Sequence, residues 1–209
     1  MTVKLLLTGF EPFGGETVNP AQDALALVPD RIGTLGIVKL ILPVVFGKSI
    51  AELRAALREH RPDAVLCIGQ AGGRMEVTPE RVALNLIDAR IPDNENNQPA
   101  DEPIFADGPA AYFATLPVKD MAAAIRIDGL PARVSNTAGL FVCNHVMYGA
   151  LYHLAHELPG AIGGFMHVPY TPEQAARQAT AQPSMATADI ARAIVAAIGA
   201  IEQHLAVRR

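Results

Sequence analysis

The stretch VKLLLTGF, residues Val3–Phe10, decides the fold class. It is an almost unbroken apolar run that ends on a glycine and an aromatic residue. A strand with one solvent-exposed face alternates polar and apolar residues, whereas an unbroken apolar run is typical of a strand buried on both faces. Sheets with both faces covered are built mainly from parallel strands that helices connect. The run therefore predicts an α/β protein with this strand inside the sheet.

Strand and helix patterns alternate along the rest of the chain. Apolar and alternating runs predict strands at 37–45, 63–69, 81–90, 132–138 and 161–170. Helical spacing predicts helices at 21–28, 49–60, 118–126, 187–205 and from Cys143 onward. Strands separated by helices imply a largely parallel sheet with helices on both faces. No linker or repeat divides the chain, so we expect residues 1–209 to form a single domain.

One segment breaks this alternation. Residues 92–110 are rich in proline, asparagine and aspartate, which predicts a long surface loop. A loop of this length inside a compact domain is usually functional or mobile.

Composition narrows the function classes. The 209 residues carry a formal net charge of −4 and form no basic stripe, so nucleic acid is not an expected partner. We find no apolar run of roughly 18 residues, as a membrane span needs, and no signal-peptide cleavage pattern. Two cysteines build no disulfide framework, and no zinc-type spacing occurs. We expect a cytoplasmic protein without a membrane partner, a metal site or a cofactor.

Cys143 is the first candidate for chemistry. It stands in GLFVCNH, residues 139–145, where an apolar run meets a helical pattern. A thiol at the start of a helix lies near free N–H groups and the positive end of the helix dipole. These lower its pKa and can bind an oxyanion. A small buried hydrophobe is an equally good interpretation. Cys67, inside AVLCIGQ, fits core packing.

A thiolate nucleophile needs a base, and His167 is the best placed of the six histidines. It lies in GGFMHVPY, residues 163–170, at the carboxyl end of an expected strand, where chemistry collects. A satisfied core histidine is the commoner interpretation of such a position. The acidic group that would orient the imidazole is open between Glu80, Asp88 and Asp93. We expect Asp93 to be solvated in the polar loop, and Glu80 by pattern alone to be an exposed charge.

The loop GFEPFGG, residues 9–15, follows the first strand. It lacks the lysine and hydroxyl residue of a P-loop and does not fit G-x-G-x-x-G. Phe10 and Phe13, framed by glycines, suit a flat uncharged ligand better than a phosphate. The alternative is that both rings pack into the core.

Six motifs occur together and in order: TGFEPFGG, VNPA, IGQAGGR, TPERVALNLIDARIPDN, SNTAGLFVCNHVMYG and GFMHVPYTPEQ. With them the chain resembles the pyrrolidone-carboxylate peptidases, also called pyroglutamyl peptidase I. The resemblance implies a cysteine exopeptidase that releases N-terminal pyroglutamate from peptides through a thioester. It also implies a three-layer α/β/α sandwich with a mixed, mostly parallel central sheet, and a homotetramer.

The resemblance also implies roles for single residues. The nucleophile falls on Cys143, the base on His167 and the acidic member on Glu80. Arg90, in DARIPDN, is implied as an aid to the oxyanion, with a surface arginine as the alternative. A pocket for the pyroglutamyl ring is implied at five residues: Phe10, Phe13, Gln70, Phe141 and Val142.

Two other functions stay open at this point. A nucleoside phosphorylase or hydrolase could use the same sheet, although no basic phosphate cluster stands out. A non-catalytic binding protein could keep the pocket without turnover. The presence of Glu80, Cys143 and His167 argues against this, because a protein without catalysis can lose any of them. Inhibition by a thiol reagent without a phosphate requirement separates the first rival from a cysteine peptidase.

Overall fold

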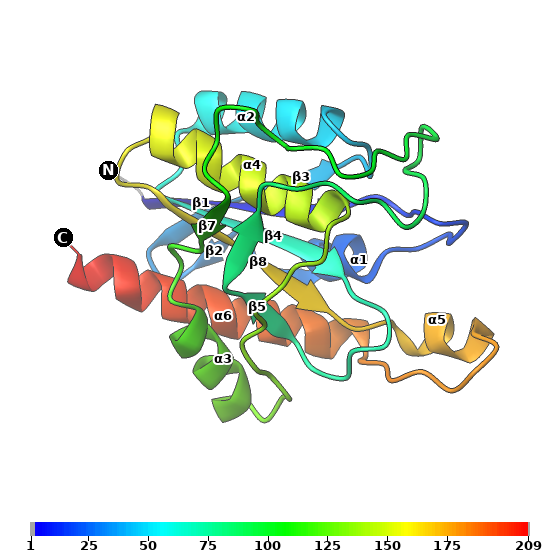
Figure 1. Cartoon of the computed structure of the whole chain (residues 1–209). Coiled ribbons are helices and arrows are strands. Elements are labelled where there is room, and N and C mark those ends of the chain that lie inside the picture. The colour runs from blue at the N-terminus through cyan, green and yellow to red at the C-terminus, as the bar shows by residue number, and fades with distance from the viewer. Residues whose placement is uncertain (1–2, 209) are drawn as a thin grey trace.

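The computed structural model describes residues 3–208 and has three layers, with helices on both faces of a central sheet (Figure 1). The sheet contains β1 (Val3–Phe10), β2 (Arg31–Ile32), β3 (Leu35–Leu42), β4 (Ala64–Gln70), β5 (Thr78–Glu80) and β8 (Ile162–Val168). A separate two-stranded ribbon contains β6 (Val82–Leu84) and β7 (Ala111–Phe113). The helices are α1 (Pro20–Leu27), α2 (Lys48–His60), α3 (Val118–Ile127), α4 (Val142–Glu157), α5 (Pro172–Arg177) and α6 (Thr187–Val207).

The central sheet is mixed and mostly parallel, as expected. Its strand order is β2-β3-β1-β4-β8-β5. Strands β3, β1, β4 and β8 run parallel, while β2 and β5 pair antiparallel at the two edges. The order places β8, a late strand in the sequence, between two earlier ones. Its neighbours β4 and β5 therefore meet the same strand from either side.

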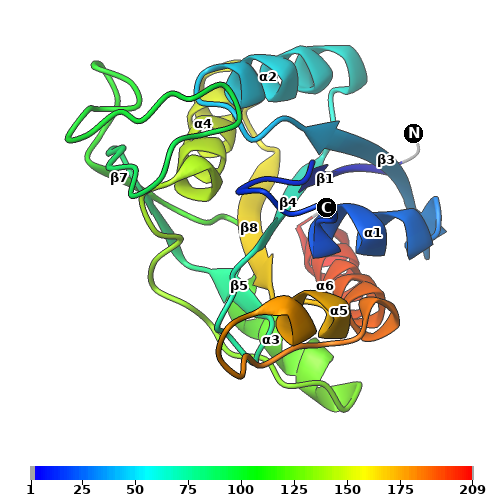
Figure 2. The same ribbon diagram turned by 90° about the vertical axis from the view of Figure 1, so that its right-hand side faces the viewer.

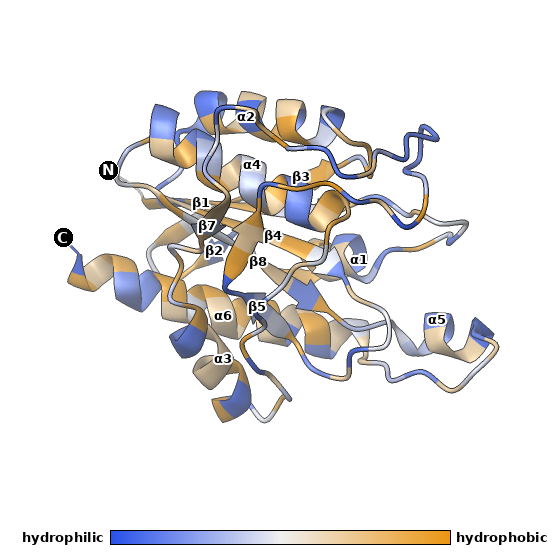
Figure 3. Ribbon diagram, viewed as in Figure 1, coloured by the Kyte–Doolittle hydropathy of each residue, from blue (hydrophilic) through white to orange (hydrophobic). Residues whose placement is uncertain are grey.

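The opening strand is buried on both faces, which confirms the interpretation of its apolar run. Leu5 and Leu7 pack with α1, α3 and α6, whereas Leu6 packs with α2 and α4. This two-residue alternation is the pleat of a strand between two helical layers. Apolar residues accordingly gather on the sheet and the inner sides of the helices (Figure 3).

Helix α6 is the longest helix of the described chain. By length and composition it could also cross a membrane, and 44% of its most apolar window is buried. Its buried side chains, among them Ile190, Ile194, Ile198 and Ile201, join the core of one helical layer. Core packing therefore accounts for its apolar face.

Two predicted strands differ from the structure. Residues 81–90 are strand only at β6, because Asn85 turns the chain away by bonding to Ile104, Phe105 and Gly108. Residues 132–138 form no strand and contribute only two isolated bridges, Val77 to Ala132 and Glu80 to Ser135. The backbone hydrogen bonds of this segment reach only from Val77 to Arg81, and Pro79 between them has no N–H to donate.

Candidate active site

Figure 2 views the molecule onto the carboxyl ends of the parallel strands, where the first turn of α4 also lies. Cys143 is the second residue of α4, and the N-cap residue Phe141 provides no side-chain hydrogen bond. Within the described chain the N–H groups of Val142, Cys143 and Asn144 have no hydrogen-bond partner. A thiol and three free donors therefore meet at one helix terminus.

Gly69 has no side chain, so the Cys143 thiol packs directly against the backbone of the sheet. A Cβ atom added at Gly69 would lie 2.9 Å from Cys143 Sγ and 2.7 Å from the ring of Phe165. The parallel register pairs Gly69 with His167, so the imidazole stands beside the same spot on the same face of the sheet. Between residues 3 and 208 no hydrogen bond yet joins the thiol to the imidazole, and such contacts often tighten only with substrate bound.

Glu80 and His167 form a buried pair across two antiparallel strands. The register sets Thr78 opposite His167 and Glu80 opposite Phe165, so Glu80 is the diagonal neighbour of the histidine. A long side chain spans that diagonal. His167 Nδ1 lies 2.8 Å from Glu80 Oε1, and both side chains are at most 4% exposed. The interpretation of Glu80 as an exposed charge is wrong, because β5 is covered on every side.

Arg74 was not singled out from the sequence, yet it contacts the same carboxylate. Its Nη1 lies 2.6 Å from Glu80 Oε1. The residue sits in the loop after β4, at the end of IGQAGGR. The sequence signals were its place as the last residue of the motif IGQAGGR and a basic residue next to a glycine-rich turn.

The residues that follow Cys143 fix the start of α4. Asn144 bonds through Oδ1 to the N–H of Leu84 and through Nδ2 to the carbonyls of Leu84 and Leu86. His145 Nε2 accepts a hydrogen bond from the N–H of Gly47. Two buried side chains thus tie this helix turn to β6 and to the loop before α2, which keeps the thiol in one place.

Cys143 contributes to the lining of a small, mostly apolar cavity. All five residues predicted for the pocket line it. The lining is Phe10, Phe13, Asn19, Val44, Gln70, Phe141, Val142 and Cys143. None of these residues carries a charge, so the cavity suits a small uncharged group.

The two side-chain amides of the lining, Gln70 and Asn19, are hydrogen-bonded to residues outside the cavity. Gln70 Oε1 accepts a hydrogen bond from Nε2 of Gln174, which is fully buried. Asn19 caps α1 and donates to the carbonyl of Glu11. Both amides therefore present a fixed orientation to the cavity.

Asp93 is not solvated, contrary to expectation. It is 5% exposed and accepts hydrogen bonds from the N–H groups of Phe46, Glu95 and Asn97. Burial opposes its ionisation, but these bonds outweigh it and lower the pKa of Asp93. The carboxylate therefore organises the loop from 93 to 97 instead of serving His167.

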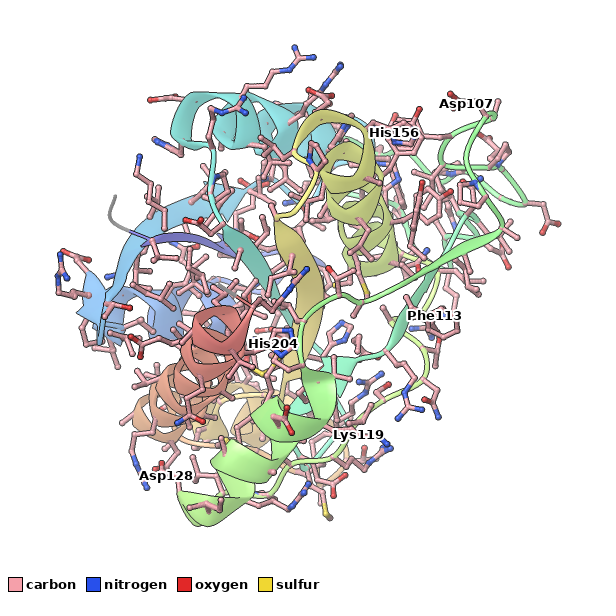
Figure 4. All side chains as sticks on the ribbon, turned by 90° about the vertical axis from the view of Figure 1, so that its left-hand side faces the viewer. Asp107, Phe113, Lys119, Asp128, His156 and His204 are labelled. Atoms are coloured by element: carbon pink, nitrogen blue, oxygen red, sulfur yellow. The ribbon has the colours of Figure 1, made fainter. Side chains whose placement is uncertain are left out.

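The remaining candidates stand apart from this cluster. Asp88 and Arg90 are exposed, and Arg90 has no hydrogen bond or ion pair with any described residue. Its role at the oxyanion stays a prediction. Figure 4 views the other end of the sheet and labels His156 and His204 there, on α4 and α6. Within residues 3–208 no group of three or more His, Cys, Asp or Glu could hold a metal ion.

Burial dominates the protonation of the site. It raises the pKa of the Cys143 thiol to about 12, with Glu80 adding to the rise and Arg74 opposing it. It also lowers the pKa of His167, against the effect of Glu80. Burial raises the pKa of Glu80, but His167, Ser135 and Arg74 reverse that and hold it below its usual value.

The fold and these contacts define the class as a hydrolase of the cysteine peptidase type, built on a mixed, mostly parallel α/β sheet. The whole chain, and not only the site, gives the narrower assignment. It belongs to the pyroglutamyl peptidase family, whose model matches residues 3–204. The resemblance drawn from the six motifs is therefore confirmed.

Single relatives agree with this family. A pyrrolidone-carboxylate peptidase of Clostridium botulinum (strain Alaska E43 / Type E3) is 49% identical over 97% of this chain and 94% of its own. One of Streptococcus pyogenes (serotype M4, strain MGAS10750) is 56% identical over 95% and 92%. The crystal structure of pyroglutamyl peptidase I from Bacillus amyloliquefaciens superposes with a TM-score of 0.92 at 49% identity, covering 96% and 95% of the two chains.

Proposed function

We propose that this enzyme hydrolyses the amide bond after an N-terminal pyroglutamyl residue by a Cys143–His167–Glu80 triad and a thioester intermediate. The observation that carries the proposal is the small, mostly apolar cavity that Cys143 helps to line, beside the buried His167–Glu80 pair. Peptides with N-terminal pyroglutamate are the substrates. The products are free 5-oxoproline and the peptide shortened by that one residue.

The reaction starts from a neutral thiol and a neutral imidazole, because burial disfavours the charge on both. His167 takes the thiol proton as sulfur attacks the carbonyl carbon, and Glu80 stabilises the imidazolium. The free N–H groups of Val142, Cys143 and Asn144 receive the oxyanion. The carbon–nitrogen bond then breaks, and the imidazolium gives its proton to the leaving amine.

Water completes the cycle. His167 removes a proton from a water molecule, whose oxygen attacks the thioester carbonyl. The carbon–sulfur bond breaks, the proton returns to sulfur, and free pyroglutamate leaves. The enzyme is restored with one water consumed and no cofactor needed.

The lining of the cavity supports selection of a lactam. It has no charged side chain, so a protonated amino terminus would lose its hydration without compensation. Gln70, held by Gln174, is placed to bond the lactam carbonyl. A prolyl ring lacks that carbonyl and would leave the N–H donors of the Gln70 side chain without a partner on the substrate, which is a basis for discrimination.

The test is release of a chromophore from a pyroglutamyl amide, with the prolyl amide as control. We expect turnover of the first only, and a loss of at least about 10³-fold in kcat for Cys143→Ser. Cys67→Ala is the matched control, because Cys67 is a buried core thiol. Full turnover by Cys143→Ser, or equal loss in both variants, contradicts the triad.

We further propose that the protein is a cytoplasmic homotetramer. Both cysteines are free thiols, which suits a reducing compartment. Leu27 and Ile127 are 56% and 88% exposed, which suits apolar contacts between copies. Light scattering behind a sizing column tests the assembly: a mass of four chains is expected, and a monomer at all concentrations contradicts it.

A further inference from the structure

Arg74 connects three segments around the site. Nη1 donates to Glu80 Oε1 at 2.6 Å and to Thr78 Oγ1 at 2.5 Å, and Nη2 donates to the carbonyl of Thr137 at 3.2 Å. Thr78 and Glu80 belong to β5, whereas Thr137 belongs to the segment that leads into α4 and Cys143. The guanidinium therefore connects β5, which carries Glu80, to the segment that precedes Cys143.

Two donors share one oxygen of the carboxylate. Glu80 Oε1 receives both Arg74 Nη1 and His167 Nδ1. A planar guanidinium that bonds to three acceptors holds its own position firmly. Since Arg74 fixes Oε1, it also fixes the direction from which Glu80 meets the imidazole.

The charges around the site alternate in sign. Once His167 has taken the thiol proton, the order is the oxyanion at Cys143, the imidazolium, the Glu80 carboxylate and the Arg74 guanidinium, which sums to zero. Glu80, Arg74 and Cys67 are the titratable groups that act on Cys143, and Glu80 and Arg74 act on His167. The proton transfer leaves this sum unchanged, so without Arg74 the group would carry a net charge of −1 both before and after it.

We propose that Arg74 is a positioning residue for the reaction, which orients Glu80 towards His167 and balances the charge of the buried triad. This inference rests on the proposed function. A purely structural ion pair is the rival explanation, and it predicts lost stability without a changed proton affinity at the site.

The sign of the expected effect follows from charge. Removing a positive charge makes protons bind more tightly, so the pKa values of Cys143 and His167 both rise. The acid limb of kcat/KM for the pyroglutamyl amide then moves to higher pH. In Arg74→Gln we expect a shift of about one pH unit and a roughly ten-fold or greater loss of kcat. We expect little change in KM, because Arg74 does not line the cavity.

Two further variants complete the experiment. Arg74→Lys keeps the positive charge but loses the planar hydrogen-bond geometry. Its acid limb of kcat/KM should therefore lie closer to that of wild type than the limb of Arg74→Gln does, while its kcat stays reduced. Arg81→Gln removes a charge next to Glu80, from a side chain without an ion pair in the described structure, and should leave the profile unchanged. Thermal unfolding of each variant reports folding.

The outcomes separate the two proposals. An unshifted acid limb in folded Arg74→Gln overturns the positioning role, as does an equal shift in Arg81→Gln. If Arg74→Gln does not fold, an Arg74→Lys variant with wild-type kcat and limb overturns it. Failure of the proposed function looks different, because wild type would not turn over the pyroglutamyl amide or Cys143→Ser would still do so.

Discussion

His167 Nδ1 and Glu80 Oε1 lie 2.8 Å apart across a diagonal of the β5–β8 pair. The antiparallel register fixes which residues face each other, so the contact depends on the strand pairing and not on flexible loops. Glu80 accepts the hydrogen bond of His167 Nδ1. Nε2 is therefore the imidazole nitrogen that can take the proton of the thiol.

This contact predicts the effect of Glu80→Gln. The amide keeps the shape but not the charge that stabilises the imidazolium, so kcat should fall by roughly 10²–10⁴-fold with little change in KM. Steady-state kinetics with the pyroglutamyl amide measures this. Glu76→Gln is the control, because Glu76 pairs with Arg133 at the surface. A Glu80→Gln enzyme with wild-type kcat would show that the imidazole works alone.

Gly69 predicts a steric effect on the nucleophile. Alanine there places Cβ 2.9 Å from Cys143 Sγ and 2.7 Å from the Phe165 ring, closer than carbon can approach either group. Displacement of the thiol by even 1 Å can cost about 10²-fold in rate, so Gly69→Ala should be nearly inactive. Alkylation of Cys143 by iodoacetamide should slow as well.

Gly199→Ala is the matched control for that substitution. A Cβ at Gly199 meets nothing within 4 Å, and the residue is inside helix α6. Alanine should therefore raise the free energy of unfolding by up to about 1 kcal/mol and leave kcat unchanged. Unimpaired activity of Gly69→Ala would mean that the thiol does not sit above the sheet.

Asp93 predicts that the pocket depends on a distant loop. Asp93→Ala removes the acceptor for the N–H groups of Phe46, Glu95 and Asn97 and should cost about 1–3 kcal/mol of stability. Phe46 packs edge-on against Phe141 at the cavity, with 5.4 Å between ring centroids, so KM should rise too. Urea unfolding and KM measure the two effects.

Glu95→Gln is the control for the loop. Its carboxylate pairs with Lys48 on the surface, where such pairs contribute little. Stability and KM should both stay near wild type. If Asp93→Ala loses kcat alone, with an unchanged KM and stability, Asp93 acts on the chemistry and the assignment to the loop is wrong.

His145 predicts a pH dependence of stability. Burial lowers its pKa in the folded protein from 6.5 to about 4. The unfolded chain therefore binds more protons between these values, and stability is lost as pH falls from 6.5 to about 4. A pKa difference of this size corresponds to about 3 kcal/mol. Urea unfolding at several pH values should show a flatter profile for His145→Gln than for wild type.

His204→Gln serves as the comparison for His145. The side chain is half-exposed on α6 and has no hydrogen bond in the described structure. Its profile should parallel that of wild type. Parallel profiles for His145→Gln and wild type would exclude a neutral buried imidazole at position 145.

The sequence predicted those features that depend on local pattern. Apolar runs identified β1, β4 and β8, and the helical pattern after Cys143 identified α4. The five predicted pocket residues lie together because they end or follow elements at one edge of the sheet. The motif resemblance added Glu80, which its local pattern had presented as exposed.

Features that depend on distant contacts could not be predicted. The burial of Asp93 follows from a loop that returns to Phe46, 47 residues away in sequence. The contact of Arg74 with Thr137 and the pKa of Cys143 depend on how segments from across the chain cover the site. The missing strand at 132–138 reflects a pairing that reaches only from Val77 to Arg81 and is interrupted at Pro79.

The late position of β8 in the chain has a consequence for biosynthesis. A ribosome makes Glu80 and Cys143 well before His167, and β8 must then insert between β4 and β5. A chain that stops before β8 contains Cys143 and Glu80 but neither His167 nor the strand that lies between β4 and β5. On the proposed mechanism such a chain lacks the base, so we expect a chain truncated before residue 167 to be inactive.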